Sequence, residues 1–246
     1  MAILENGSLK GLVGNLVFRK SNEKTIVQTG PGRKTKQTKA TKAAAIDFGH
    51  VSTAGSRIRN IMGEIHLNMH DSIMHNRLIN HLKRVTRANR APVGEKTIRG
   101  GKIDRLINFQ FVEKCHMHDY VHFDPEIKLL DTKQVAIQFP KFDMQNDIHR
   151  PKYCNLMKIN LMIAVFNFDK QQYIRWHKHE IPINLQAPSK DVELEELLFD
   201  VNYQDAETIL VGMNIEYYER FSDNYTLLNN KDFHPAAIVG AFIIDP

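Results

Sequence analysis

The spacing of apolar residues predicts two helices in the first half of the chain. Thr38 is a suitable N-cap, so a first helix is expected to begin near Lys39. Its apolar residues recur at helical spacing: Ala40, Ala43, Ala44, Ile46, Val51, Ala54, Ile58 and Ile61. Gly49 and Gly55 lie inside this stripe, where they either break the helix or allow a neighbouring element to approach closely. A second helix is predicted from about Leu67 to Ala88, with an apolar face of Leu67, Met74, Leu78, Leu82 and Val85.

From Leu106 onward the period of the apolar positions changes to two, which is typical of half-buried strands. Strands are expected at Ile107–Phe111, Val135–Phe139, Leu156–Phe168, Tyr173–Trp176, Ile181–Leu185, Ile209–Tyr218 and Ala236–Ile244. Leu194–Phe199 fits either a strand or one helical turn. Many strands without long intervening helices favour an antiparallel sandwich with Greek-key-like connections. The predicted fold is therefore α+β: an N-terminal β-hairpin and two helices, followed by an antiparallel β-sandwich.

The stretch from Gly11 to Gly30 has the pattern of a β-hairpin. Its strands carry apolar and β-branched residues that need cover, namely Leu16, Val17, Phe18, Thr25, Ile26 and Val27. A tight type I′ turn prefers glycine where Glu23 stands, so either the loop is longer or Asn22 alone is left-handed. An isolated hairpin is marginal in water. We expect these six residues to pack on a second copy of the chain or on the chain's own sandwich.

Three short motifs follow one another in this region. They match G-x-x-G-N-x-V-F-x-K at Gly11, Gly14, Asn15, Val17, Phe18 and Lys20, then T-x-V-x-x-x-P at Thr25, Val27 and Pro31, then K-Q-T-K-A-T-K-A at Lys36 to Ala43. With these motifs the chain resembles an uncharacterised family of small proteins from Bacteroidota. The Asn-Gly turn of that family is replaced here by Asn22-Glu23. The resemblance is confined to the N-terminal region, and it implies no activity, cofactor or catalytic residue.

Charge is divided unevenly along the chain. Through Arg105 there are 20 Lys and Arg residues against 7 Asp and Glu, a balance of +13, whereas the remainder carries −8. The polar loop Ala91–Lys102 separates the two parts, so we predict domains at residues 1–105 and 106–246. This segregation indicates that the basic part faces either a polyanion or the acidic part of a neighbouring subunit.

Two groups of basic residues are candidates for polyanion contact. One is the arm after the hairpin and the other is the polar face of the second helix: Arg33, Lys34, Lys36, Lys39 and Lys42, then Arg77, Lys83, Arg84, Arg87 and Arg90. No aromatic residue interleaves the arm, and no helix-turn-helix, zinc-finger or RNA-recognition signature is present. Any nucleic-acid contact is therefore expected to be backbone-directed and non-specific. The alternative is a solubilising face with a docking arm.

The 12 histidines raise the question of a metal site. The densest groups are Cys115, His116, His118 and His122, and then His177 and His179. On a strand, each His-x-His pair offers two imidazoles on one face, but exposed histidines without a ligand are the simpler interpretation. There is no Gly-x-Ser-x-Gly elbow and no His-Glu-x-x-His motif. We expect no enzymatic activity, no cofactor and no metal.

Compartment signals are few. The N-terminus lacks a basic segment followed by a sustained apolar run, so we expect cytoplasmic synthesis without a signal peptide. The longest apolar run, Leu161–Phe166, is too short to span a bilayer. Cys115 and Cys154 are expected to be free thiols in such a chain.

The favoured interpretation is a non-enzymatic structural protein that self-assembles into a homo-oligomer through the hairpin and arm. A phage-like or other particle or filament is the kind of assembly expected. The alternative is a non-specific nucleic-acid-associated protein that binds through the basic arm and the second helix.

Overall fold

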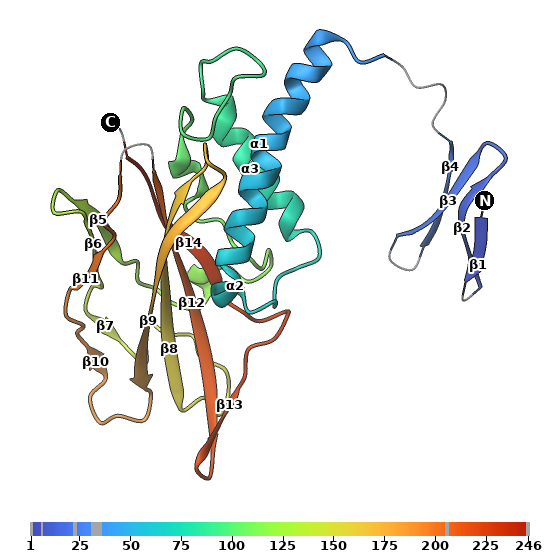
Figure 1. Ribbon diagram of the computed structural model, residues 1–246. Coiled ribbons are helices and arrows are strands. Elements are labelled where there is room, and N and C mark those ends of the chain that lie inside the picture. Colours follow the sequence, from blue (N-terminus) through green and yellow to red (C-terminus); the bar gives the residue numbers. More distant parts are fainter. Residues whose placement is uncertain (1, 6, 22–23, 31–35, 205–206, 245–246) are drawn as a thin grey trace. The chain divides into compact units, whose positions relative to one another are not determined.

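The computed structural model describes residues 2–5, 7–21, 24–30, 36–204 and 207–244 (Figure 1). The chain forms two units, Met1–Thr41 and Lys42–Pro246. The first contains a small antiparallel sheet, and the second contains the remaining sheets with helices packed on them. The predicted α+β class is confirmed.

The N-terminal unit holds a four-stranded antiparallel sheet in which consecutive strands are neighbours. These strands are β1 (Ala2–Glu5), β2 (Ser8–Val13), β3 (Leu16–Ser21) and β4 (Lys24–Thr29). The predicted hairpin is confirmed as β3 and β4, whereas the two strands before it were not predicted. Gly7 and Gly14 lie in the preceding turns with φ of 71° and 57°, which glycine adopts without steric cost. The prediction for Asn22 and Glu23 lies outside the described residues.

The first predicted helix is a single continuous element, α1 (Lys39–Ile61). The hydroxyl of Thr38 accepts a hydrogen bond from the backbone N–H of Thr41 at 3.2 Å, which confirms the N-cap. The two internal glycines do not break the helix. A Cβ at Gly55 would lie 2.6 Å from Cδ1 of Ile79, so this glycine allows α1 to pack closely on α3 (Met74–Arg87).

The second predicted helix begins later than expected. A short helix, α2 (Gly63–His66), is followed by Leu67 and Asn68 with positive φ of 48° and 56°, and α3 starts only at Met74. The predicted start near Leu67 is therefore wrong, because residues in the left-handed conformation end a helix. The predicted apolar face is present within α3, where it buries Met74, Leu78, Leu82 and Val85.

The larger unit is built on a central antiparallel sheet. Its strands β9 (Gln172–Asn184), β8 (Leu156–Asn167) and β12 (Thr208–Phe221) are neighbours in that order, and β14 (Ala236–Ile243) and β13 (Asn224–Leu227) both pair with β12. β8 is an almost continuous apolar sequence because both of its faces are covered. Met162, Ala164 and Phe166 pack with the helices, whereas Leu161 and Ile163 point to the opposite face.

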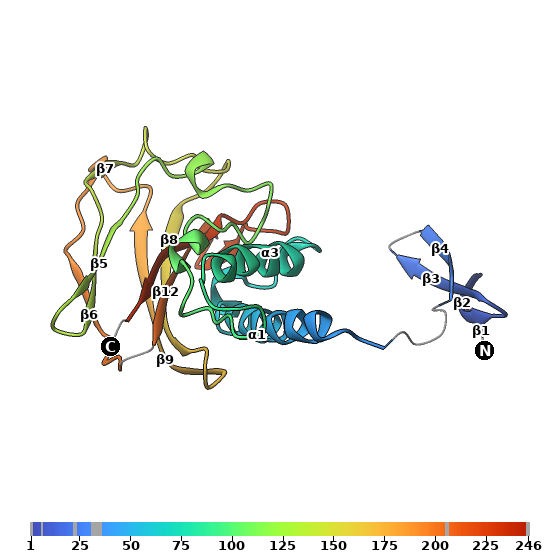
Figure 2. The same cartoon turned by 90° about the horizontal axis from the view of Figure 1, so that it is seen from above.

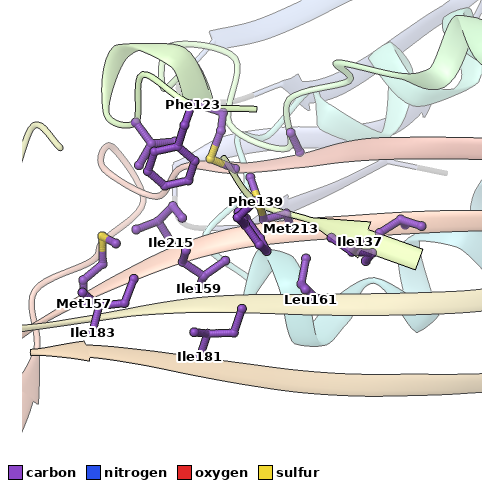
Figure 3. Packing of buried hydrophobic residues seen from close by; sticks show 14 of the residues in the cluster. Phe123, Ile137, Phe139, Met157, Ile159, Leu161, Ile181, Ile183, Met213 and Ile215 are labelled. Carbon is purple, nitrogen blue, oxygen red and sulfur yellow. The ribbon is translucent and has the colours of Figure 1, made fainter. Parts of the chain in front are cut away.

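Smaller sheets cover that opposite face. β5 (Glu126–Leu130), β6 (Gln134–Gln138) and β11 (Leu197–Asp200) form a three-stranded sheet, and β7 (Phe142–Asp143) pairs with β10 (Asp191–Val192). Figure 1 and Figure 2 show α1 and α3 on one side of β8 and β12, with β5 and β6 on the other. Figure 3 shows the core between the sheets, where Ile137 and Phe139 meet Leu161 and Met213. The predicted sandwich is present, and the helices add a third layer.

Most predicted strand positions correspond to β6, β8, β12 and β14. Tyr173–Trp176 and Ile181–Leu185, predicted as two strands, largely belong to the single strand β9. Ile107–Phe111 is not a strand; it follows the 3₁₀ turn η1 (Ile103–Leu106) and forms backbone hydrogen bonds with β14. Leu194–Phe199 becomes a strand only from Leu197 onward.

A buried polar network attaches α2 to the central sheet. The carbonyl oxygen of Ile65 accepts hydrogen bonds from Nδ2 of Asn214 and Nε2 of His234, both at 2.7 Å. Nδ2 of Asn160 donates in turn to Oδ1 of Asn214 at 2.7 Å. Burial lowers the pKa of His234, which favours a neutral imidazole with its proton on Nε2. The last carbonyls of a helix lack intrahelical partners. The side chains of Asn214 and His234 supply hydrogen bonds to one of them, the carbonyl of Ile65 in α2.

The division of the chain differs from the predicted domains 1–105 and 106–246. The helices and the central sheet share one hydrophobic core, in which Ile58 and Leu82 pack with Phe166. The loop 91–102 therefore joins parts of a single unit, and the division lies between Thr41 and Lys42. The physical reason is that amphipathic helices bury their apolar stripe against the sheet rather than against each other alone.

Candidate functional site

The register of the N-terminal sheet gathers most of its apolar side chains on one side. Residues that pair across strands share a face, and Leu4 pairs with Leu9, Val13 with Leu16, and Phe18 with Val27. We define the apolar face as Ala2, Leu4, Leu9, Val13, Leu16, Phe18 and Val27. These residues share their side of the sheet with Lys20, Thr25 and Thr29, at one end of β3 and along β4. None of these side chains is buried; Leu4 is 72% exposed and Val27 is 50% exposed.

The opposite face of this sheet mixes apolar and charged side chains, with Ile3, Leu12, Val17 and Ile26 beside Glu5, Lys10, Arg19 and Lys24. Among the six predicted assembly residues, four lie on the apolar side (Leu16, Phe18, Thr25 and Val27) and two lie opposite (Val17 and Ile26). β1 and β4 each pair with a single strand among the described residues, so both outer edges offer backbone groups for pairing.

The predicted basic arm lies partly outside the described residues. Arg33 and Lys34 fall outside them, whereas Lys36, Lys39 and Lys42 are exposed. Lys39 and Lys42 belong to the first turn of α1, where the positive end of the helix dipole disfavours cations. Among the described residues of the arm, the exposed charge therefore lies at and just before the start of α1.

A second basic surface forms where α3 meets the loop that follows it. We define the basic platform as Lys83, Arg84, Arg87, Arg90, Lys96, Arg99, Lys102 and Arg105. The backbone N–H of Lys102 lies 3.4 Å from the carbonyl oxygen of Val85, and Nη1 of Arg105 donates to the carbonyl of Arg84 at 2.6 Å. Among the described residues, none of the eight platform cations has a carboxylate oxygen within 4.0 Å.

Arg77, predicted as a polyanion contact, is turned toward the protein's own backbone. Its guanidinium forms an ion pair with Asp71, donates to the carbonyl of Gln110 at 2.8 Å and lies 5.2 Å from the ring centre of Phe109. These contacts tie α3 to the segment beside β14. The other predicted helix residues lie on the platform. The structure adds to it three cations of the loop and one of η1 that the sequence did not single out: Lys96, Arg99, Lys102 and Arg105.

An apolar groove opens beside the platform, between α1 and α3. It encloses about 360 Å³ and is lined by Ala44, Asp47, Phe48, Val51, Lys83, Thr86, Arg87, Val93 and Lys96. Phe48 is 49% exposed, and Nζ of Lys83 lies 4.8 Å from its ring centre. The carboxylate of Asp47 accepts the N–H groups of Gly94 at 3.0 Å and Lys96 at 3.1 Å, which holds the loop against α1. The groove thus has an aromatic wall and a cationic rim.

The histidines considered as metal ligands do not converge on a common site among the described residues. His179 on β9 packs edge-on against Phe199 at 5.7 Å, and His177 precedes it on the same face of the strand. His118 lies in the 3₁₀ turn η2 (Met117–Asp119), with its Nδ1 3.6 Å from Oδ1 of Asp124. Within the described ranges, no group of three or more His, Cys, Asp or Glu side chains is placed to hold a metal ion.

The two cysteines are buried and free, as predicted. Burial raises the pKa of the Cys115 and Cys154 thiols, which disfavours the reactive thiolate. Neither thiol therefore has the environment of an activated nucleophile.

No helix in the described part of the chain is both long enough and apolar enough to cross a membrane. No protein-family model, no curated protein and no solved structure matches the chain. Two surfaces remain from which a function can be inferred: the apolar face of the N-terminal sheet, and the basic platform with its groove.

Proposed function

We propose that the protein is a non-enzymatic structural protein that self-assembles through its N-terminal sheet. The apolar face carries this proposal, because none of its seven side chains is buried. An antiparallel sheet normally packs one face on a core, and a contiguous exposed apolar patch is typical of an interaction surface. Two open strand edges add further capacity for pairing.

Charge complementarity favours another copy of the same chain as the partner. The basic arm carries five cations, and residues 191–200 carry five exposed carboxylates: Asp191, Glu193, Glu195, Glu196 and Asp200. Of these, Asp191 is paired with Lys141 of the same chain. The apolar face supplies contact area, and the arm orients the sheet on the acidic surface of a neighbour. A contact between two different surfaces repeats from copy to copy, so it builds a ring or a filament.

Polar substitutions on the two faces of the sheet test this proposal. Leu4→Thr with Val27→Thr removes apolar area from the apolar face but keeps residues that suit strands. Ile3→Thr with Leu12→Thr is a matched control on the opposite face, where the two residues are 69% and 45% exposed. The molecular mass of the native protein, from sedimentation velocity, should fall toward the monomer in the first variant only. A wild-type monomer at all concentrations, or equal effects of both pairs, would contradict self-assembly through the apolar face.

A further inference from the structure

We infer that the groove and the basic platform bind single-stranded nucleic acid, with a base on Phe48 and phosphates on the surrounding cations. This inference concerns the larger unit alone and does not rest on self-assembly.

Unpaired positive charge is the first observation that favours it. Elsewhere in the larger unit, some exposed lysines have carboxylate partners, as in Lys128–Glu126 at 2.7 Å and Lys141–Asp191 at 2.7 Å. Lysines without such a partner among the described residues, for example Lys170 and Lys231, lie far apart in the sequence. Segment 83–105 instead holds eight cations and only two carboxylates, those of Glu95 and Asp104. Like charges held together repel one another, and a row of phosphates relieves that repulsion while releasing counterions.

Hydrogen bonds hold the backbone of the loop in place, and Nζ of Lys96 itself donates to the carbonyl oxygen of Asn89 at 3.1 Å. Oδ1 of Asn89 accepts the N–H of Ala91 at 2.8 Å, and Nδ2 of Asn89 donates to the carbonyl of Thr97 at 3.2 Å. Asp47 fixes the same loop to α1 through the backbone of Gly94 and Lys96. A site with fixed donors loses less conformational entropy on binding than a flexible arm does.

The aromatic wall of the groove favours a single strand over a duplex. Unpaired bases can stack on an aromatic side chain, and a cationic groove with such a side chain is how many proteins bind single strands without sequence preference. The half-exposed ring of Phe48 supplies that surface, in a groove whose 360 Å³ lies in the range of small-molecule sites. Lys83, Arg87 and Lys96 surround it and can reach the flanking phosphates.

The remaining polar groups of the groove are already occupied. Both carboxylate oxygens of Asp47 accept backbone N–H groups, and Oγ1 of Thr86 donates to the carbonyl of Lys83 at 3.2 Å. With few groups left to read base edges, we expect affinity that depends strongly on salt and weakly on sequence.

Fluorescence anisotropy with the full chain and a labelled oligothymidine, in a series of salt concentrations, tests the inference. Phe48→Ala should weaken binding about tenfold or more through lost stacking. The triple variant Lys83→Gln, Arg87→Gln, Lys96→Gln should reduce the slope of log affinity against log salt by about 2, since each phosphate contact contributes about 0.7. Lys83→Arg, Arg87→Lys and Lys96→Arg together should retain the wild-type slope, because the three charges remain.

The matched control is Lys128→Gln, Lys170→Gln, Lys231→Gln, which removes the same charge from exposed positions outside the platform. It should leave the slope unchanged. The inference is overturned by an absence of binding at low salt, or by a reduction of the salt slope in this control that equals the reduction in the platform triple variant. Binding that survives Phe48→Ala also overturns it. Equal affinity for a duplex of the same length, or for phosphatidylserine vesicles, would also overturn it.

A last comparison separates the platform from the basic arm. The variant Lys34→Gln, Lys36→Gln, Lys39→Gln, Lys42→Gln should retain most of the affinity. If it loses binding while the platform triple variant keeps it, the arm is the site and the inference fails. Native mass is measured independently of anisotropy, so failure here leaves the assembly proposal unaffected.

Discussion

Replacing Gly101 by alanine should destabilise the larger unit by forcing the platform loop away from α3. A Cβ at Gly101 would lie 2.4 Å from the carbonyl oxygen of Val85 and 2.8 Å from its carbonyl carbon. These are backbone atoms of a helix, so the loop must withdraw by about 1 Å to restore an ordinary contact. Overpacking of this kind costs about 1–3 kcal/mol, and alanine returns about 0.4–1 kcal/mol by restricting the unfolded chain. The central values of the two effects leave a net loss of about 1.3 kcal/mol in the free energy of unfolding.

Urea unfolding followed by tryptophan fluorescence measures this effect, because the single tryptophan, Trp176, lies on β9 in the larger unit. Gly49→Ala is the matched control: Gly49 lies inside α1, and a Cβ there meets no atom within 4 Å. Helix propensity alone should make this control more stable by about 1 kcal/mol. With an unchanged m-value, the two midpoints should move in opposite directions. A Gly101→Ala midpoint equal to the wild type would refute the close packing of the loop on α3.

The buried polar and thiol groups of the larger unit give three further predictions. Burial lowers the pKa of His66 to about 4 and also lowers that of His234. Below about pH 6.5 only the unfolded chain takes up these protons, so the free energy of unfolding should fall by up to about 1.4 kcal/mol per pH unit for each histidine. Urea midpoints that stay level down to about pH 5 would contradict this. Asn214→Ala should lower the free energy of unfolding in urea by about 1–3 kcal/mol, because Nδ2 of Asn160 loses its buried acceptor and the carbonyl of Ile65 loses one of its two side-chain donors. An unchanged urea midpoint would show that the network is dispensable. Cys115 and Cys154 should resist Ellman's reagent in the folded protein and react after unfolding, and rapid labelling of the native protein would contradict their burial.

Features that depend on neighbours in the sequence were predictable. Thr38 and the stripe after it located the start of α1, and the apolar residues of Leu156–Phe168 located β8 as a strand. Its coverage on both faces was not predicted. The hairpin of β3 and β4 followed from two β-type segments around a polar turn. β1 and β2 were missed although a signal was present: the Asn6-Gly7 dipeptide between two short strands is the strongest short-range indication of a hairpin.

Features that depend on packing were not predictable. The polar loop 91–102 looks like a linker in sequence, and only its hydrogen bonds to Asp47 and Asn89 show that it belongs to the helical layer. The groove requires Phe48 and Lys83, 35 positions apart, to meet across two helices. Arg77 has the spacing of a solvent-facing residue, yet besides its ion pair with Asp71 it contacts Phe109 and the carbonyl of Gln110, more than 30 positions away. None of these contacts has a local pattern.

The native mass of the protein with and without residues 1–32 tests self-assembly most directly. Those residues contain the entire N-terminal sheet, whereas both hydrophobic cores of the larger unit begin at or after Val51. The truncated chain should therefore stay soluble and unfold cooperatively, as reported by Trp176. We predict that the full chain sediments as an oligomer whose mass rises with concentration, and that the truncated chain sediments as a lower-order species. A full-length chain that is monomeric throughout, or a truncated chain that unfolds or aggregates, would contradict assembly through the N-terminal sheet.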